Sequence, residues 1–313
     1  MENKTLIMVP YAFGTSGIGE NIKRYDASLS IYLKNCCGAL ITAKQYNHGS
    51  DVALVTNIKE IPHPYKEIFD KNGIIVIFCE FNEFLFPDEG KWRLAFYKLC
   101  ALSFVVNNFD YDYYSYFDTD IIVQSSFDNI WKECGNKVLL YDICQGLQVK
   151  DYILFNNECE SFLKVLSMDT TQNVTRYGGE FFAGSKKSAS LFVSECLSIF
   201  KSMIAYKIRT SKGDEFIISL FAHMRPDLIK NAGAYIFRFW TGSFRLISTS
   251  YINQPVTILH VQGEKENGMI SLYDYFWKKG KSPSKKQVWK KLHILKPSFI
   301  TRIKIIAKRI LKK

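Results

Sequence analysis

At residues 116–123 the chain reads Tyr-Phe-Asp-Thr-Asp-Ile-Ile-Val, which places two carboxylates one residue apart inside an aromatic and aliphatic run. This run predicts a buried strand over residues 113–123, in which alternation points Asp118 and Asp120 to the same side. Ionised carboxylates removed from water are costly unless a cation compensates them. The pair therefore predicts a magnesium or manganese site at the end of a parallel strand, and the alternative is a turn with two solvated acids.

The chain before this strand alternates short apolar runs with helical patterns. Strands are predicted at residues 5–9, 51–57 and 73–78, and helices at residues 21–37 and 91–107. Such alternation is typical of an α/β fold with a mostly parallel, Rossmann-like sheet flanked by helices.

The elements after residue 123 are shorter and mixed. The predicted strands cover residues 137–141, 152–155 and 256–261, and the predicted helices cover residues 158–168, 187–206 and 214–223. We expect one mixed α/β domain over residues 1–275, with halves at 1–125 and 126–275, and a basic tail over residues 276–313.

The positive charge of the chain is concentrated at its C-terminal end. The formal net charge is +11, but residues 278–313 hold 14 Lys and Arg and no Asp or Glu. The rest of the chain carries 27 basic and 30 acidic residues. A general nucleic-acid-binding surface is therefore not expected.

Cysteine use and the N-terminal sequence indicate a cytoplasmic protein. The eight cysteines form no Cys-x-x-Cys pair and no zinc-like spacing with the five histidines, which predicts reduced thiols. The apolar run at residues 6–13 is short, contains Pro10 and lacks a cleavage pattern. No stretch approaches the roughly 20 apolar residues that span a bilayer.

Three later segments carry residues suited to a site. Residues 176–184 read Arg-Tyr-Gly-Gly-Glu-Phe-Phe-Ala-Gly, and their glycines allow the backbone to approach another group closely. Residues 212–215 open a helix with two acids, which also favour the helix dipole without any further role. Residues 260–265 read His-Val-Gln-Gly-Glu-Lys after an apolar strand. The histidine there is either structural or a third metal ligand, and the lysine can reach a diphosphate.

In this order and at these separations, the motifs resemble the nucleotide-sugar glycosyltransferases of GT-A fold, most closely the retaining enzymes of glycosyltransferase family 8. The resemblance covers roughly residues 1–275, and its most specific part combines Asp-x-Asp with His-x-x-Gly-x-Lys. It implies a nucleotide-sugar half over residues 1–125 and an acceptor half over residues 126–275.

The resemblance also implies roles for individual residues. The metal ligands would be Asp118, Asp120 and His260. Contacts to the nucleotide sugar would come from Lys98, Asp118, Asp120, Gly263 and Lys265, and Asn57, at the end of a predicted strand, is a further candidate for the base or ribose. Contacts to the sugar or acceptor would come from Gly178, Gly179 and Glu180. The catalytic acids would be Asp214 and Glu215, as a nucleophile or as a support for the oxocarbenium-like centre.

The chain departs from the family pattern at three places. Lys98 stands where arginine is usual, Asp214-Glu215 where Asp-Gln is usual, and Glu266-Asn267 where Pro-Trp follows the late lysine. The glycine-rich segment also resembles the retaining enzymes of family 6, whose acceptor-side acids are arranged differently. Both families imply retention of the anomeric configuration.

The resemblance implies a hexosyltransferase that uses Mn²⁺ or Mg²⁺ and a nucleotide diphosphate sugar, with a UDP-sugar as the first expectation. The acceptor would be a hydroxyl of a glycan or lipid-linked glycan in bacterial polysaccharide or lipopolysaccharide synthesis. A sugar nucleotidyltransferase would also use Asp-x-Asp and a metal, but its glycine-rich basic signature near the first strand is absent. A non-catalytic membrane-surface adaptor would explain the tail but not the two acids.

Residues 298–313, drawn as a helix, separate into two faces. The apolar arc holds Phe299, Ile300, Ile303, Ile306, Ala307, Ile310 and Leu311, and the other face is basic except for Ile305. Such a helix can lie in the headgroup region of an anionic membrane, with Trp277 and Trp289 upstream able to favour the interface. We expect a peripheral protein on the inner face of the membrane, and the alternative is a helix packed on its own domain.

Overall fold

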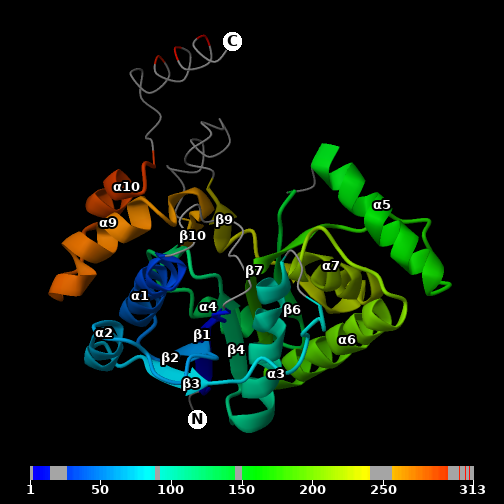
Figure 1. Ribbon diagram of the computed structural model, residues 1–313, viewed down its shortest axis with the longest axis horizontal. Helices are drawn as coiled ribbons and strands as arrows, with labels where there is room; N and C mark the ends of the chain where they lie inside the picture. The colour runs from blue at the N-terminus through cyan, green and yellow to red at the C-terminus, as the bar shows by residue number, and fades with distance from the viewer. Residues whose placement is uncertain are drawn as a thin grey trace.

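The computed structural model describes most of the chain. The described residues are 3–14, 27–88, 92–144, 150–239 and 256–294, together with Ile303, Ala307 and Ile310 of the tail. The predicted α/β class is confirmed: a mixed, mostly parallel sheet is flanked by helices (Figure 1).

The main sheet has seven strands in the order β3-β2-β1-β4-β7-β6-β8. Their bounds are β1 (Thr5–Tyr11), β2 (Asp51–Thr56), β3 (Ile75–Phe78), β4 (Tyr113–Phe117), β6 (Val138–Asp142), β7 (Tyr177–Ser185) and β8 (Ile229–Asn231). The first four strands of the order are parallel, and β7 is antiparallel to both β4 and β6. All side chains of β1 are buried, because helices cover both faces of the sheet.

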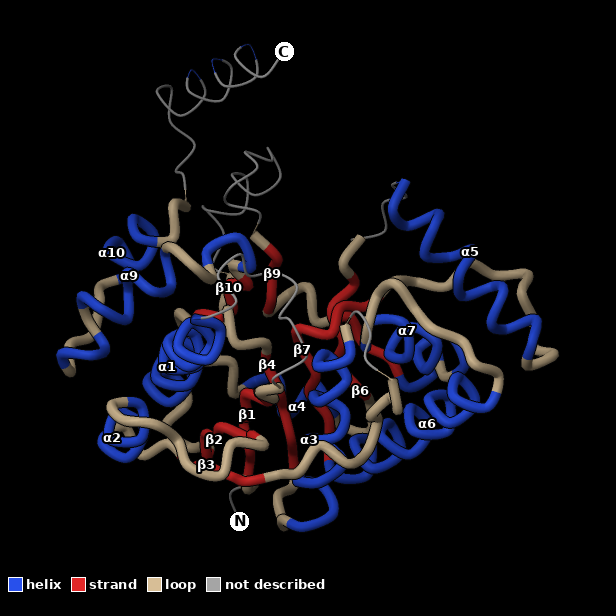
Figure 2. Tube along the Cα trace, viewed as in Figure 1, coloured by secondary structure: helices blue, strands red, loops and turns tan. Residues whose placement is uncertain are grey.

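Alternate residues of β1 point into two separate cores. Ile7 and Val9 face a cluster that includes α1 (Ser28–Tyr46), whereas Leu6 and Met8 face a cluster that includes α3 (Tyr97–Asn108). The first core also contains parts of α2 (Tyr65–Lys71), α4 (Asn129–Cys134), α9 (Gly268–Tyr275) and α10 (Lys285–Lys291). The second contains parts of α5 (Lys150–Val165), α6 (Lys186–Ala205) and α7 (Asp214–Met224). Figure 2 shows the strands between these two groups of helices.

A second, three-stranded sheet contains β5 (Ile121–Val123), β10 (Ile258–His260) and β9 (Ile236–Arg238) in that order. The prediction of one strand over residues 113–123 is therefore wrong. The chain leaves the main sheet after Phe117, turns through Asp118–Asp120 and pairs antiparallel with β10. The polar turn interrupts an apolar run that is otherwise buried on both sides.

The predicted strand at residues 152–155 is also wrong, because these residues lie in α5. The buried side chains Phe155, Cys159 and Phe162 recur at helical spacing, while Ile153 and Leu154 are exposed. Four adjacent apolar or aromatic residues do not distinguish a strand from one turn of a helix.

The expectation that no stretch is long and apolar enough to span a bilayer is wrong by length and composition, because one described helix, α6, meets both criteria. Its side chains Phe192, Cys196 and Met203 lie in the second core with those of α3 and α7. Within the described part of the chain, α6 is thus a core helix of the domain.

The first part of the expected tail packs on the domain. Trp277 is 3% exposed, and a Cβ on Gly38 of α1 would lie 2.7 Å from its ring. Trp289 of α10 donates from Nε1 to Gln124 Oε1 at 3.0 Å. The packed body therefore continues beyond residue 275 to Ile294, which belongs to the first core.

Candidate active site

The turn between β4 and β5 lies where the two sheets meet. Asp118 N donates to Glu180 O of β7 at 3.1 Å, and Val261 N, just after β10, donates to Asp120 O at 3.0 Å. The backbone of the turn is thus held to both sheets. These contacts bring the Asp-x-Asp pair beside His260, the last residue of β10.

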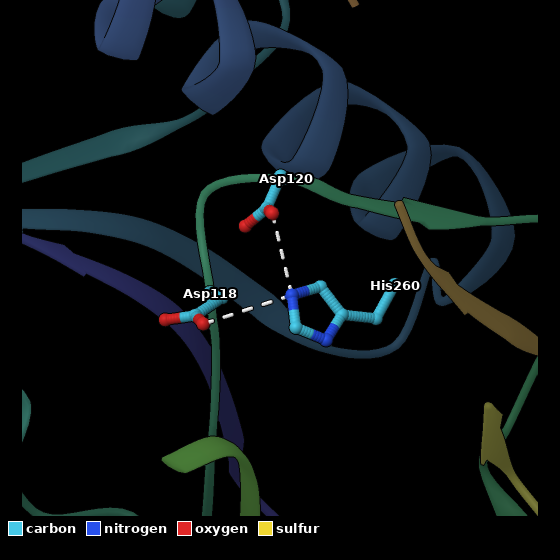
Figure 3. A group of neighbouring side chains, drawn as sticks. All are labelled: Asp118, Asp120 and His260. Carbon is cyan, nitrogen blue, oxygen red and sulfur yellow. Dashed lines mark ion pairs between the residues drawn. The ribbon is translucent and has the colours of Figure 1, made fainter. Parts of the chain in front are cut away.

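His260 and the two aspartates form a cluster suited to a cation. His260 Nε2 lies 3.3 Å from Asp120 Oδ2 and 3.8 Å from Asp118 Oδ2 (Figure 3). One ligand atom from each residue can be chosen so that all lie within 4.8 Å of one another. Asp118 is 27% exposed, whereas the side chains of Asp120 and His260 are buried. Among the three described side chains, Asp118 is therefore the most exposed.

The carboxylate of Asp120 supports a cation at this place. Its side chain is 0% exposed, and neither of its oxygens accepts a hydrogen bond from a described residue. A buried ionised carboxylate is costly unless positive charge lies beside it, and in the metal-free protein Lys265 and His260 provide that charge. Two oxygen ligands and one imidazole are a donor set that fits a divalent cation.

Two buried lysines flank the cluster. Lys265 Nζ lies 3.4 Å from Asp120 Oδ2 and 5.6 Å from the centre of the Tyr32 ring. Lys98 Nζ lies 3.0 Å from Asp118 Oδ1 and 3.0 Å from Asp214 Oδ2. Burial disfavours both ammonium groups, but the neighbouring carboxylates outweigh it and raise the pKa of both lysines. Both side chains are therefore positively charged at neutral pH.

His260 is also protonated in the absence of a metal. Burial disfavours the imidazolium, but Asp120 and Glu180 outweigh it and raise the pKa of His260 to about 9. Burial likewise disfavours the charged form of Asp120, but Lys265 and His260 hold the pKa of Asp120 below its ordinary range. The cluster thus keeps Asp120 ionised.

The two acids at the start of α7 lie in different surroundings. Asp214 is buried, and burial raises its pKa to about 6 against the opposing effect of Lys98. Glu215 lies between two guanidinium groups, 2.6 Å from Arg176 Nη2 and 3.0 Å from Arg238 Nη2. Asp214 therefore belongs to the lysine side of the site and Glu215 to the arginine side.

The glycines of β7 leave room for these acids. A Cβ on Gly178 would lie 1.8 Å from Glu180 Oε2, and a Cβ on Gly179 would lie 2.0 Å from Asp214 Oδ2. Any side chain at either position would displace a carboxylate of the site. Glu180 itself is 0% exposed at its side chain and pairs with Arg238 and His260.

Asn57 and Gly263 are the two remaining predicted site residues. Asn57 Oδ1 accepts from Phe13 N at 2.8 Å, and its Nδ2 donates to Phe13 O at 2.9 Å. Its amide thus connects the end of β2 with the segment after β1. No described contact joins it to Asp118, Asp120 or His260. Gly263 is exposed in the short 3-10 turn Gln262–Glu264, which carries the chain from His260 back to Lys265.

Eight of the predicted residues, together with two that the sequence did not single out, form one ion network. Its members are Lys98, Asp118, Asp120, Arg176, Glu180, Asp214, Glu215, Arg238, His260 and Lys265. Arg176 opens the glycine-rich segment, but its partner Glu215 is distant in sequence. Arg238 lies in a three-residue strand without any recognisable motif, so only the pairing of β9 with β10 reveals it.

No protein-family model matches the chain, and no curated protein sequence matches it. The chain is an α/β protein in which two aspartates and one histidine lie close enough together to hold a metal ion.

Proposed function

We propose that the chain is a metal-dependent glycosyltransferase. It moves a hexose from a nucleotide diphosphate sugar, first of all a UDP-sugar, to a hydroxyl of a glycan or lipid-linked glycan, with retention of configuration. The product belongs to bacterial polysaccharide or lipopolysaccharide synthesis. The observation that carries the proposal is the cluster of Asp118, Asp120 and His260, whose ligand atoms lie within 4.8 Å of one another beside the buried ammonium of Lys265.

The charge of the network supports an anionic substrate held with a cation. The network joins five carboxylates to four lysine and arginine side chains, so it has one negative charge in excess once His260 has lost its proton to bind a metal. A divalent cation on Asp118, Asp120 and His260 reverses that sign and favours a diphosphate. Manganese and magnesium both suit these ligands.

The residues of the chain have separable tasks in this reaction. Bound at the triad, the cation supplies Lewis-acid stabilisation of the departing diphosphate. Lys265 adds a positive charge beside Asp120, and Lys98 holds Asp118 and Asp214 in place. The leaving phosphate can take the proton of the acceptor hydroxyl on the front face, so retention does not require a base from the protein.

The surroundings of the acid pair favour different roles for its members. Glu215 shares its charge with Arg176 and Arg238, which makes its carboxylate a weak nucleophile. It is better suited to electrostatic support of positive charge at the anomeric carbon. Asp214, with one lysine partner, is suited to accept a hydrogen bond from a sugar hydroxyl.

A panel of nucleotide sugars tests the proposal. The protein is mixed with each sugar and with manganese or magnesium, and binding and slow release of the nucleoside diphosphate are measured. We expect tightest binding and release with a UDP-sugar in the presence of metal. Metal-independent binding, or no binding to any nucleotide diphosphate, contradicts the proposal. Formation of pyrophosphate from a nucleoside triphosphate and a sugar phosphate would instead identify a nucleotidyltransferase.

We also propose that the enzyme works on the cytoplasmic face of the membrane, held there by its tail. Ile303, Ala307 and Ile310 are helical and exposed, with exposed fractions of 50% for Ile303 and 69% for Ile310. Their spacing puts them on one face of a helix. An exposed apolar face in a basic segment fits an anionic lipid surface better than packing on the domain.

A further inference from the structure

The two ring nitrogens of His260 face different carboxylates. Nε2 lies 3.3 Å from Asp120 Oδ2, whereas Nδ1 lies 3.4 Å from Glu180 Oε1. In Figure 3 the ring directs one nitrogen toward Asp118 and Asp120 and the other away from them. A neutral imidazole has one N–H, and only the other nitrogen can bind a metal. The position of that proton therefore decides whether His260 can act with the two aspartates.

The surroundings of Glu180 hold its carboxylate in one orientation. Its side chain has no exposed surface, and Arg238 donates to both of its oxygens, from Nε to Oε1 at 2.8 Å and from Nη2 to Oε2 at 2.6 Å. An ionised carboxylate only accepts hydrogen bonds, so it favours the imidazole form with the proton on Nδ1. Carboxylates hold metal-binding histidines in this way in many proteins.

The strand pairing brings these groups together. Arg238 and His260 are register partners on the parallel strands β9 and β10, and Glu180 O accepts from Asp118 N at 3.1 Å. Gly178 leaves the space that the Glu180 carboxylate occupies, because a Cβ there would lie 1.8 Å from Oε2. One residue of β7 thus contacts both the Asp-x-Asp turn and the histidine.

We propose that Glu180 is a positioning residue that keeps the proton of His260 on Nδ1, so that Nε2 is available to a divalent cation beside Asp118 and Asp120. This role rests on the proposed metal site.

The variant Glu180→Gln tests the role without any turnover. Manganese binding is measured by electron paramagnetic resonance of the free ion, and we expect the affinity to fall about 10- to 100-fold. Glu215→Gln is the matched control, because Glu215 also pairs with Arg238 but makes no described contact with His260. The manganese affinity of this control is expected to remain close to that of the wild type. Thermal unfolding of both variants reports any general loss of structure.

The outcomes separate this role from the proposed function. If the wild type binds manganese and Glu180→Gln binds it equally well, the positioning role is overturned and the metal site stands. Equal weakening in both variants also overturns it, because the effect would then come from the pairing with Arg238. A wild type that binds no manganese overturns the metal site and this inference together.

A second measurement needs no change at Glu180. Nitrogen NMR of ¹⁵N-histidine in the protein loaded with cadmium, a diamagnetic ion, shows which ring nitrogen carries hydrogen. The signal of His260 is assigned from its loss in His260→Gln. A proton on Nδ1 and cadmium on Nε2 support the role, and a proton on Nε2 overturns it.

Discussion

Lys265 Nζ lies 3.4 Å from Asp120 Oδ2, and both side chains are buried. This pair joins the turn after β4 to the segment after β10. The lysine supplies charge to Asp120, but no described donor makes a hydrogen bond to that carboxylate. Asp120 is therefore already ionised and oriented before any ligand binds.

Asp120→Asn should abolish the dependence of nucleotide diphosphate binding on manganese and leave the fold intact. We expect turnover to fall at least about 100-fold, the scale for loss of a major charge contact in a transition state. Calorimetry of UDP binding with and without manganese measures the first effect, and a transfer assay measures the second. Asp70→Asn is the control, because Asp70 forms an exposed pair with Lys66. Full activity of Asp120→Asn, or of the wild type in chelator, contradicts the metal assignment.

Lys265→Ala should weaken nucleotide diphosphate binding and slow transfer, because its ammonium is the buried cation nearest to Asp120 apart from His260. Binding of the free nucleoside diphosphate and steady-state kinetics with varied donor measure these effects. Lys66→Ala provides a control on an exposed lysine. A variant in which only the KM for the acceptor changes would place Lys265 elsewhere in the mechanism.

Gly179→Ala should damage the site through Asp214, since the new Cβ would lie 2.0 Å from Asp214 Oδ2. Overpacking of this kind destabilises a protein by about 1–3 kcal/mol, and we expect a lower unfolding temperature together with slower transfer. Gly49→Ala is the matched control, because nothing lies within 4 Å of its Cβ position. Equal behaviour of the two variants would show that Asp214 tolerates displacement.

Manganese affinity should rise with pH. Because the pKa of His260 is raised to about 9, the metal-free protein holds a proton at neutral pH that must leave when the imidazole binds metal. Below that pKa, release of one proton makes the affinity rise about tenfold per pH unit. Calorimetry in two buffers with different ionisation enthalpies measures the number of protons released when manganese binds.

The raised pKa of His260 also makes the stability of the metal-free protein depend on pH. The pKa of His260 is higher in the folded state than the ordinary value of 6.5. The contribution of protonated His260 to the free energy of unfolding is therefore complete below pH 6.5 and is lost as the pH rises through about 9.

A manganese affinity that does not change between pH 6 and pH 8 would show that His260 is not a ligand.

Deletion of residues 298–313 should release the protein from anionic vesicles without abolishing hydrolysis of the nucleotide sugar, because the described site lies before Ile294. Co-sedimentation with vesicles measures binding, and binding of the intact protein should weaken with salt, since screening acts within about 10 Å at 0.1 M. An insoluble deletion variant would place the apolar arc in the core. Indifference of the intact protein to anionic vesicles at low salt would refute the membrane role.

Local patterns in the sequence predicted the fold class and the three residues of the cluster, Asp118, Asp120 and His260. The buried strands β1 and β2 and the helices α6 and α7 follow from apolar runs and helical spacing, which are properties of short segments. The resemblance of Asp-x-Asp and His-x-x-Gly-x-Lys to a known pair of motifs also depends on the sequence alone. A buried ionised acid such as Asp120 requires compensating positive charge whatever surrounds it, so that requirement was predictable.

Only the tertiary structure decided that the strand ends at Phe117 and which charged side chains lie next to one another. The turn forms because β5 pairs with β10 in a second sheet, and that pairing joins segments more than 130 residues apart in the printed sequence. The same is true of Arg238, which faces Glu180 because β9 lies beside β10. Ion pairs of this kind depend on strand order and register, and no local pattern encodes either. The role of a charged residue such as Glu180 is therefore set by its neighbours in space rather than by its motif.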